Sequence, residues 1–141
     1  MRLVLDASVA LAWLFERQHP DEAELATQVL GALPNVEASV PALWHAEIVN
    51  ALLVGERRRV VAEAWTVDYL TRLSRLPIST DDRVAASRRE PVLALSREHG
   101  LTACDATYLD LALRTDAKLA TFDTKLVDAM RRTGGALLAT A

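Results

Sequence analysis

Cysteine is almost absent from this chain: Cys104 is the only one among 141 residues. A lone cysteine excludes an intrachain disulfide and is typical of a reducing compartment, so we predict a cytoplasmic protein. The 3 histidines show no metal-ligand spacing and no C-x-x-C pair occurs, which argues against a zinc site. No apolar run is long enough to cross a bilayer, and the apolar segment 3–5 follows Met1 too closely for a signal peptide.

Glycine-rich motifs are missing as well. Neither G-x-G-x-x-G nor a Walker-type loop occurs, which argues against binding of dinucleotides and nucleoside triphosphates. The chain also has no internal repeat, low-complexity tract or Gly/Ser linker. Its 51% hydrophobic and 25% charged residues are typical of a globular protein with a substantial core. We therefore predict one domain over residues 1–141.

Short β-like runs alternate with longer segments of helical period. This alternation predicts an α/β protein with a parallel sheet that is covered on both faces. Strands are expected at 3–5, 38–40, 77–80, 118–122 and 136–139. Helices are expected at 7–15, 20–33, 42–58, 60–76, 81–89, 92–99, 105–115 and 125–132. In such sheets, ligand sites collect beyond the carboxyl ends of the strands.

Two aspartates follow directly after predicted strands. Asp6 ends the run VLD, Asp123 ends ATFD, and a predicted helix follows each. If both strands are parallel, both carboxylates emerge at the same edge of the sheet. Either residue taken alone is also explained as the N-cap of the helix that follows it.

Two further acids stand out by their positions. Glu47 lies in a helical segment that is apolar almost all round, where burying an unpaired carboxylate costs free energy. The ordinary alternative to a functional role is a buried ion pair between Glu47 and an arginine. Asp105 precedes a predicted helix, and an N-cap is again the ordinary alternative. Asp110 and Arg114 are four residues apart on that helix, so we expect them to form an exposed pair.

Four acids brought to one edge of a sheet would repel one another unless a cation lay among them. Hard cations with oxygen ligands are the natural partners, and Mg²⁺ favours a few carboxylates, several waters and a phosphate. Such a site can clamp a phosphodiester, activate water and stabilise the leaving oxygen.

In this order, the four acidic segments resemble the PIN-domain ribonucleases, and among them the VapC-type toxins of toxin–antitoxin systems. The matching segments are VLDASVAL, WHAEIVNAL, GLTACDATYLDLAL and LATFDTKL, and the similarity extends from the first strand to the last. Each segment is weak alone, but four in the right order are specific. One departure is Cys104, where the family often has an aromatic residue.

The resemblance implies a PIN-like fold with a five-stranded parallel sheet between helices. It also implies Mg²⁺- or Mn²⁺-dependent endonucleolytic cleavage of RNA, and inhibition by a small cognate antitoxin. The catalytic and metal-binding acids would be Asp6, Glu47, Asp105 and Asp123. The supporting residues would be Ser8, Asn50 and Thr121.

The predicted helix near the N-terminus has more apolar residues than one helix face can bury in the core. They comprise Leu11, Trp13, Leu14 and Phe15, and the helical segment 42–58 adds more. Excess apolar surface of this kind indicates an interface. We therefore expect a homodimer, and a groove near the first helices that accepts an amphipathic antitoxin segment.

The arginines of the middle third are candidate RNA phosphate contacts, although for any one of them solubility or helix capping is the simpler role. They are Arg57, Arg58, Arg59, Arg72, Arg75, Arg83, Arg88 and Arg89. The net charge of −3 includes the four site acids. Without them the chain has 16 basic and 15 acidic residues, so the rest of the protein is slightly positive.

Two other functions are open from the residues. The first is an Asp-dependent phosphotransfer domain with Asp6 as phosphoacceptor. A haloacid-dehalogenase-like site would need a second aspartate where Ser8 stands, and Lys125 is only a loose match for the lysine of a receiver domain. The second is a non-catalytic PIN-like module that binds RNA or protein; the presence of all four acids argues against it.

Overall fold

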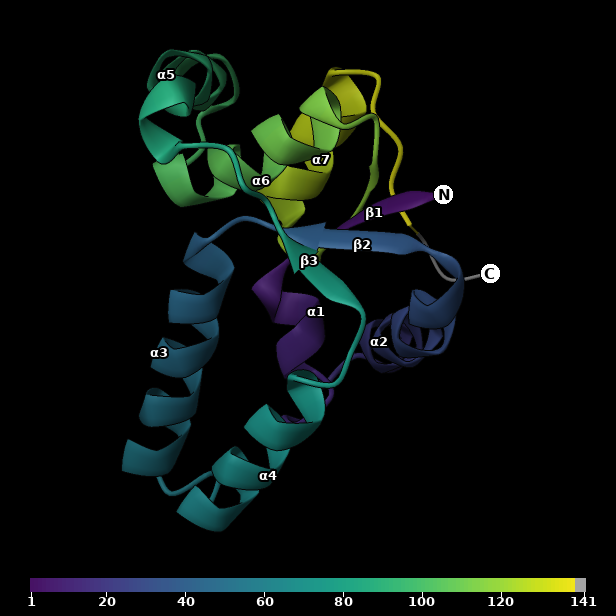
Figure 1. The fold of residues 1–141 in the computed structure, drawn as a ribbon, viewed down its shortest axis with the longest axis vertical. Helices are drawn as coiled ribbons and strands as arrows, with labels where there is room; N and C mark the ends of the chain where they lie inside the picture. Colours follow the sequence, from purple (N-terminus) through teal and green to yellow (C-terminus); the bar gives the residue numbers. More distant parts are fainter. Residues whose placement is uncertain (139–141) are drawn as a thin grey trace.

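Four parallel strands form the centre of the protein in a computed structural model that describes residues 1–138. The strands are β1 (Arg2–Leu5), β2 (Glu37–Val40), β3 (Ile78–Thr80) and β4 (Lys118–Ala120). Their order in the sheet is β3-β2-β1-β4, so β1 and β4 are neighbours although more than a hundred residues separate them (Figure 1). The alternation of strands and helices therefore correctly predicts an α/β fold with a parallel sheet.

Helices cover the sheet in two layers (Figure 1). On one side lie α1 (Ala7–Leu11), α2 (Pro20–Ala32), α3 (Leu43–Arg57) and α4 (Glu63–Leu73). On the other side lie α5 (Arg89–His99), α6 (Ala103–Arg114) and α7 (Thr124–Arg132). Within residues 1–138, no helix combines the length and the apolar character that a membrane span requires.

The apolar run 3–5 forms the centre of the core. Leu3, Val4 and Leu5 are fully buried because β1 lies between β2 and β4 and has helices on both faces. A strand of this kind reads as an unbroken apolar run, since neither of its faces meets water. Its carboxyl end is thereby fixed in the middle of the sheet edge.

The fifth strand, expected at 136–139, is not formed as a strand. Leu137 makes a single parallel bridge to Leu119 beside β4, and residue 139 lies outside the described residues. The sheet of the described chain is thus four-stranded. After the turn at Gly134, which has a positive φ of 78°, the segment pairs with β4 through two backbone hydrogen bonds of 3.0 Å, both made with Leu119.

The helix expected at 81–89 is also wrong. A 3₁₀ turn, Ala85–Arg88, occupies part of this range, and α5 begins at Arg89 with Pro91 in its first turn. Proline is tolerated there because the first N–H groups of a helix have no intrahelical acceptor. Asp81, the first residue of the expected helix, accepts a bidentate pair from Arg114 at 2.7 and 3.3 Å.

Asp110 is buried, not exposed as the pattern predicts. Only 5% of the residue is accessible, and Arg88 donates to both of its carboxylate oxygens, at 2.6 and 3.0 Å. Arg114 Nε lies 3.8 Å from the same carboxylate. A chain of ion pairs through Arg88, Asp110, Arg114 and Asp81 thus connects α6, which carries Asp105, to the segments that follow β3.

We predict that Asp110→Asn lowers the free energy of unfolding by about 2 kcal/mol, because it removes a buried charge on which two arginines converge. Urea unfolding of the variant and the unmodified chain measures the difference. Asp68→Asn is the matched control, since its partner Arg72 is exposed and the loss should stay below about 0.5 kcal/mol. Equal effects of the two substitutions would contradict a structural role for the Asp110 pairs.

Candidate active site at the carboxyl ends of the strands

All four predicted acids line one open pocket at the edge where β1 and β4 end. Asp6 follows β1, Asp123 lies three residues after β4, Glu47 projects from α3, and Asp105 lies in the first turn of α6. The remaining lining residues are Ala7, Ser8, Leu11, Arg17, Asn50 and Phe122. The strand ends and two helices therefore bring together acids that are far apart in the sequence.

Asp6 is the N-cap of α1 by backbone position, but its side chain caps nothing. Its Oδ2 accepts hydrogen bonds from the hydroxyls of Ser8 and Thr121, each at 2.7 Å. The residue is 8% exposed, so two hydroxyls hold a buried carboxylate in one orientation. The capping interpretation therefore does not account for the side chain of Asp6.

Thr121 connects the two strand-end acids. Its Oγ1 donates to Asp6 and accepts from the backbone N–H of Asp123 at 3.1 Å. Ser8 Oγ accepts in the same way from the N–H of Phe122, at 3.2 Å. The two hydroxyls thus lock the segment after β4 to the segment after β1.

Glu47 is paired with a phenol and not with an arginine. Tyr108, which is fully buried in α6, donates its hydroxyl to Glu47 Oε1 at 2.5 Å. The sequence pattern did not single out Tyr108, because its spacing along α6 is that of an ordinary core residue. Since the bond crosses from α6 to α3, it fixes Glu47 relative to the helix that carries Asp105.

The carboxylate of Asp123 caps a helix, whereas that of Asp105 does not. Thr102, and not Asp105, is the N-cap of α6, and its Oγ1 accepts from Asp105 N at 3.1 Å. The Asp105 carboxylate is therefore free of a cap role. Asp123 does cap α7: its Oδ1 accepts from Leu126 N at 3.0 Å, while the residue also lines the pocket.

Burial and mutual repulsion perturb the acids of this pocket. Desolvation is the largest cause that raises the pKa of Asp6, and the charge of Asp123 adds to it against the hydroxyl bonds. Desolvation also raises the pKa of Glu47, where the charges of Asp6 and Asp105 contribute in the same direction. For Asp105, burial and then the charges of Asp123 and Asp6 raise the pKa. The ionised cluster is thus unfavourable by itself.

The donor set suits a hard cation, since every candidate ligand is a carboxylate or hydroxyl oxygen. Within residues 1–138, however, no three Asp, Glu, His or Cys side chains lie close enough together to form a metal site as they stand. Mg²⁺ retains several waters and takes only one or two carboxylates directly, so a wider ring of acids is compatible with it. A metal therefore fits the chemistry of these residues, whereas a preformed cage is absent from the described chain.

Arg17 lines the pocket, and sequence reasoning missed it. It follows α1, its guanidinium lies 4.8 Å from the centre of the Phe122 ring, and it pairs with Glu22 at 2.6 Å. The arginines that the sequence favoured are placed elsewhere: Arg88 is bound to Asp110 and Arg72 to Asp68. Among the predicted set, Arg58 comes nearest, because it lines the adjoining groove.

That groove lies between α3 and the segment from α1 to Arg17, and shares Ser8, Leu11, Arg17 and Asn50 with the acidic pocket. Gly55 lets the Phe15 ring pack closely against α3, since a Cβ at this position would come within 2.9 Å of that ring. The further lining residues are Ala12, Phe15, Ala51, Val54, Gly55, Arg58 and Val60. A largely apolar groove near the first helices is therefore present and opens beside the acids.

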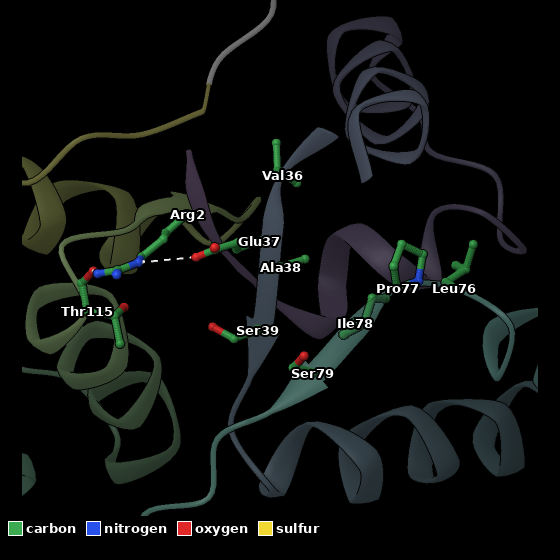
Figure 2. Close-up of a pocket in the computed structure, with 10 residues that line it drawn as sticks. All are labelled: Arg2, Val36, Glu37, Ala38, Ser39, Leu76, Pro77, Ile78, Ser79 and Thr115. Atoms are coloured by element: carbon green, nitrogen blue, oxygen red, sulfur yellow. Dashed lines mark hydrogen bonds and ion pairs between the residues drawn. The ribbon is translucent and has the colours of Figure 1, made fainter. Parts of the chain in front are cut away.

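A second hollow, of about 590 Å³, lies away from the acids (Figure 2). Its lining comes from the first halves of β2 and β3 and includes the exposed pair of Arg2 and Glu37. Ser39 and Ser79 are the other polar side chains of the two strands there. Because it lacks clustered carboxylates and lies toward the amino ends of the strands, this hollow is a weaker candidate for an active site than the acidic pocket.

We predict that Asp6→Asn stabilises the metal-free protein by about 1 kcal/mol at pH 8, because it removes a desolvated charge that Asp123 repels. A carboxyl with a raised pKa takes up a proton on folding, so its destabilising effect is full above the raised pKa. It disappears as the pH falls to the ordinary value of 3.8.

Urea unfolding in chelator, from pH 8 down to pH 4, measures this prediction. The advantage of the Asn variant over the unmodified chain should shrink with falling pH, whereas Asp128→Asn, at an exposed position of α7, should show no such trend. An advantage that is absent at pH 8, or that grows as the pH falls, would rule out the repulsive cluster.

Comparison with known proteins finds relatives of similar sequence and similar fold. Ribonuclease VapC3 of Pyrobaculum aerophilum is 28% identical over 128 residues, which cover 91% of this chain and 94% of that protein. The crystal structure of PAE2754 from the same organism has a TM-score of 0.66 at 21% identity, covering 97% of this chain and 88% of that one.

Two further solved structures are similar. FitAcB from Neisseria gonorrhoeae has a TM-score of 0.64 at 17% identity, covering 98% of this chain and 97% of that one. A toxin–antitoxin complex from Klebsiella pneumoniae has a TM-score of 0.60 at 20% identity, covering 87% and 88%. The family model of the PIN domain matches residues 3–132, which include all four acids of the pocket, and the chain therefore belongs to the PIN domain family.

Proposed function

We propose that this protein is a divalent-metal-dependent endoribonuclease and the toxin of a toxin–antitoxin pair. The observation that carries the proposal is the convergence of Asp6, Glu47, Asp105 and Asp123 on one pocket, with no arginine or lysine paired to any of them within residues 1–138. A relative that is named a ribonuclease and a structural neighbour that is a toxin–antitoxin complex support the proposal.

The metal, Mg²⁺ or Mn²⁺, would be held by the four acids, and would supply charge neutralisation and activation of a water for attack on an RNA phosphodiester. The chain's own residues prepare that position. The hydroxyls of Ser8 and Thr121 hold Asp6 Oδ2, and Tyr108 holds Glu47 Oε1, so each acid presents its other oxygen in a fixed direction. Asn50 lines the same pocket as a further polar group.

Phosphotransfer through Asp6 is disfavoured by its surroundings. Oδ2 accepts two hydrogen bonds, and the position that a haloacid-dehalogenase-like enzyme fills with a second aspartate holds Ser8, which is one of the donors. A phosphoacceptor needs an accessible oxygen and a cation beside it. A non-catalytic PIN-like module remains the outcome if no RNA is cleaved.

We propose that the groove between α1 and α3 receives an amphipathic segment of a small antitoxin. Helix-in-groove recognition needs an apolar channel of this kind. Because the groove opens into the acidic pocket, a bound segment can extend an Arg or Lys to the same carboxylates. Binding and inhibition would then be coupled through one electrostatic contact.

A homodimer stays a prediction. The apolar side chains exposed on the α3–α4 hairpin favour it, with Val60 at 68% and Trp65 at 64% exposure. Trp13, in contrast, is half-buried and donates its indole N–H to the carbonyl of Ala26 at 2.8 Å. A charge at Trp65 is therefore a cleaner probe of association than one at Trp13.

We expect cleavage of a mixed RNA pool with Mg²⁺ or Mn²⁺, little with Ca²⁺, and none in excess chelator. Asp6→Asn, Glu47→Gln, Asp105→Asn and Asp123→Asn should each lower the rate more than about 100-fold, because each removes a ligand charge. Thr121→Val should cost about 10-fold, since it loosens a ligand without removing one.

Gel electrophoresis of labelled RNA measures these rates, with thermal unfolding to verify folding. Asp128→Asn, which changes an exposed acid away from the pocket lining, is the control and should cleave at the unmodified rate. Near-normal cleavage by two or more of the four site variants would refute the site. Full cleavage in chelator would point to a metal-free ribonuclease.

We predict that Val54→Glu abolishes inhibition by the antitoxin while leaving RNA cleavage within about 2-fold, because Val54 lines the groove but not the acidic pocket. The chain is co-expressed with the antitoxin under test, and complex formation and cleavage are measured. Leu30→Glu, at an exposed position of α2 outside the groove, is the matched control. Equal inhibition of both variants would exclude the groove as the docking site.

A further inference from the structure

The acidic pocket has one basic residue in its lining, Arg17. Its position is defined from two sides. The guanidinium lies over the ring of Phe122, which stands between Thr121 and Asp123, and its Nε and Nη2 contact Glu22 Oε2 at 2.6 Å. The guanidinium of Arg17 is therefore held at the wall of the pocket, where it neutralises none of the four acids.

We propose that Arg17 binds an RNA phosphate next to the scissile one, and that Glu22 competes with RNA for the same guanidinium. The proposal rests on the proposed ribonuclease function. It names the residue that positions the substrate, and a carboxylate that holds this residue in check before RNA binds.

Charge favours phosphate as the ligand of Arg17. Four carboxylates repel an RNA backbone unless cations face it at the rim, and Arg17 is the rim residue that reaches both the pocket and the adjoining groove. A guanidinium also matches the geometry of phosphate oxygens, and stacking on Phe122 keeps it planar and oriented. Nη1 has no hydrogen-bond partner within residues 1–138, so one amino group is available before Glu22 is released.

The pair with Glu22 is not strong enough to exclude a phosphate. The side chains of Arg17 and Glu22 are 36% and 25% exposed, so water still reaches both groups and screens the attraction between them. Glu22 also lies in the first turn of α2, where a carboxylate is favoured even without an arginine. RNA can therefore displace Glu22 without disturbing the fold.

The experiment measures binding of a fluorescent single-stranded RNA by anisotropy, in Ca²⁺ so that turnover is slow. We expect Arg17→Gln to raise Kd about 5- to 10-fold and to reduce the slope of log Kd against log salt by about 0.7, the value for one contact to a single strand. Arg17→Lys should retain most of the affinity, because its charge still reaches a phosphate.

Glu22→Gln should act in the opposite direction and lower Kd about 2- to 5-fold, because it frees the guanidinium. This gain should vanish when Arg17→Gln is added. Arg72 and Asp68 supply the control, since they form a more exposed ion pair on α4, at 78% and 52%, and line neither the acidic pocket nor the groove. Arg72→Gln and Asp68→Asn should each change Kd less than about 2-fold.

Opposite signs for the two single variants support the proposal, whereas equal losses would show that the pair only tethers the loop and would overturn it. Unchanged binding by Arg17→Gln would overturn it too, as would loss of antitoxin binding alone or the absence of RNA binding by the unmodified chain. Cleavage with Mg²⁺ is read in parallel. If Arg17→Gln cleaves RNA at the unmodified rate, the ribonuclease function holds but the proposed phosphate contact does not. If RNA binding depends on Arg17 but no RNA is cleaved, the ribonuclease function is refuted and the phosphate contact is not.

Discussion

The hydrogen bond from Thr121 Oγ1 to Asp6 Oδ2 joins the ends of two neighbouring parallel strands. β1 and β4 bring these residues together from opposite ends of the sequence, and the same hydroxyl then accepts from the N–H of Asp123. One threonine therefore holds the carboxylate of Asp6 beside the backbone of Asp123, although the charges of the two aspartates repel each other. Glu47 and Asp105 are added to this frame by α3 and α6, which the bond between Tyr108 and Glu47 holds together.

Connectivity explains why the strand-end acids could be predicted from the sequence. A buried parallel strand reads as an apolar run, and the residue after it must lie at the carboxyl edge of the sheet. Asp6 and Asp123 follow from this rule, and the resemblance to PIN domains supplied Thr121 and Ser8, whose hydroxyls the structure places on Asp6. The rule does not predict whether a segment at the edge of the sheet pairs regularly enough to form a strand. The single bridge at Leu137 is what remains of the expected fifth strand.

Contacts over long sequence distances mark the limit of sequence reasoning here. Tyr108 is 61 residues from Glu47, and Arg88 is 22 residues from Asp110. The spacing of Asp110 and Arg114 suggested an exposed pair because local rules see only neighbours on one helix. Arg17 was missed for a related reason: it lies in the segment after α1, where no periodicity shows which way a side chain points. Its two partners come from different elements.

Two buried aspartates of this protein show how the site differs from ordinary core chemistry. Asp110 and Asp6 are similarly inaccessible, at 5% and 8% exposure. Two arginines approach the carboxylate of Asp110, one of them with a bidentate pair. The carboxylate of Asp6 instead accepts from two hydroxyls, pairs with no arginine or lysine within residues 1–138, and has a second carboxylate close enough to raise its pKa. With 16 Lys and Arg in the chain, a cation for Asp6 was available. Arg17, which lines the same pocket, is instead paired with Glu22. The fold thus neutralises the structural carboxylate internally and leaves the pocket acids short of positive charge. That deficit costs stability, and it is the physical reason for proposing that a cation from outside the chain binds among these acids.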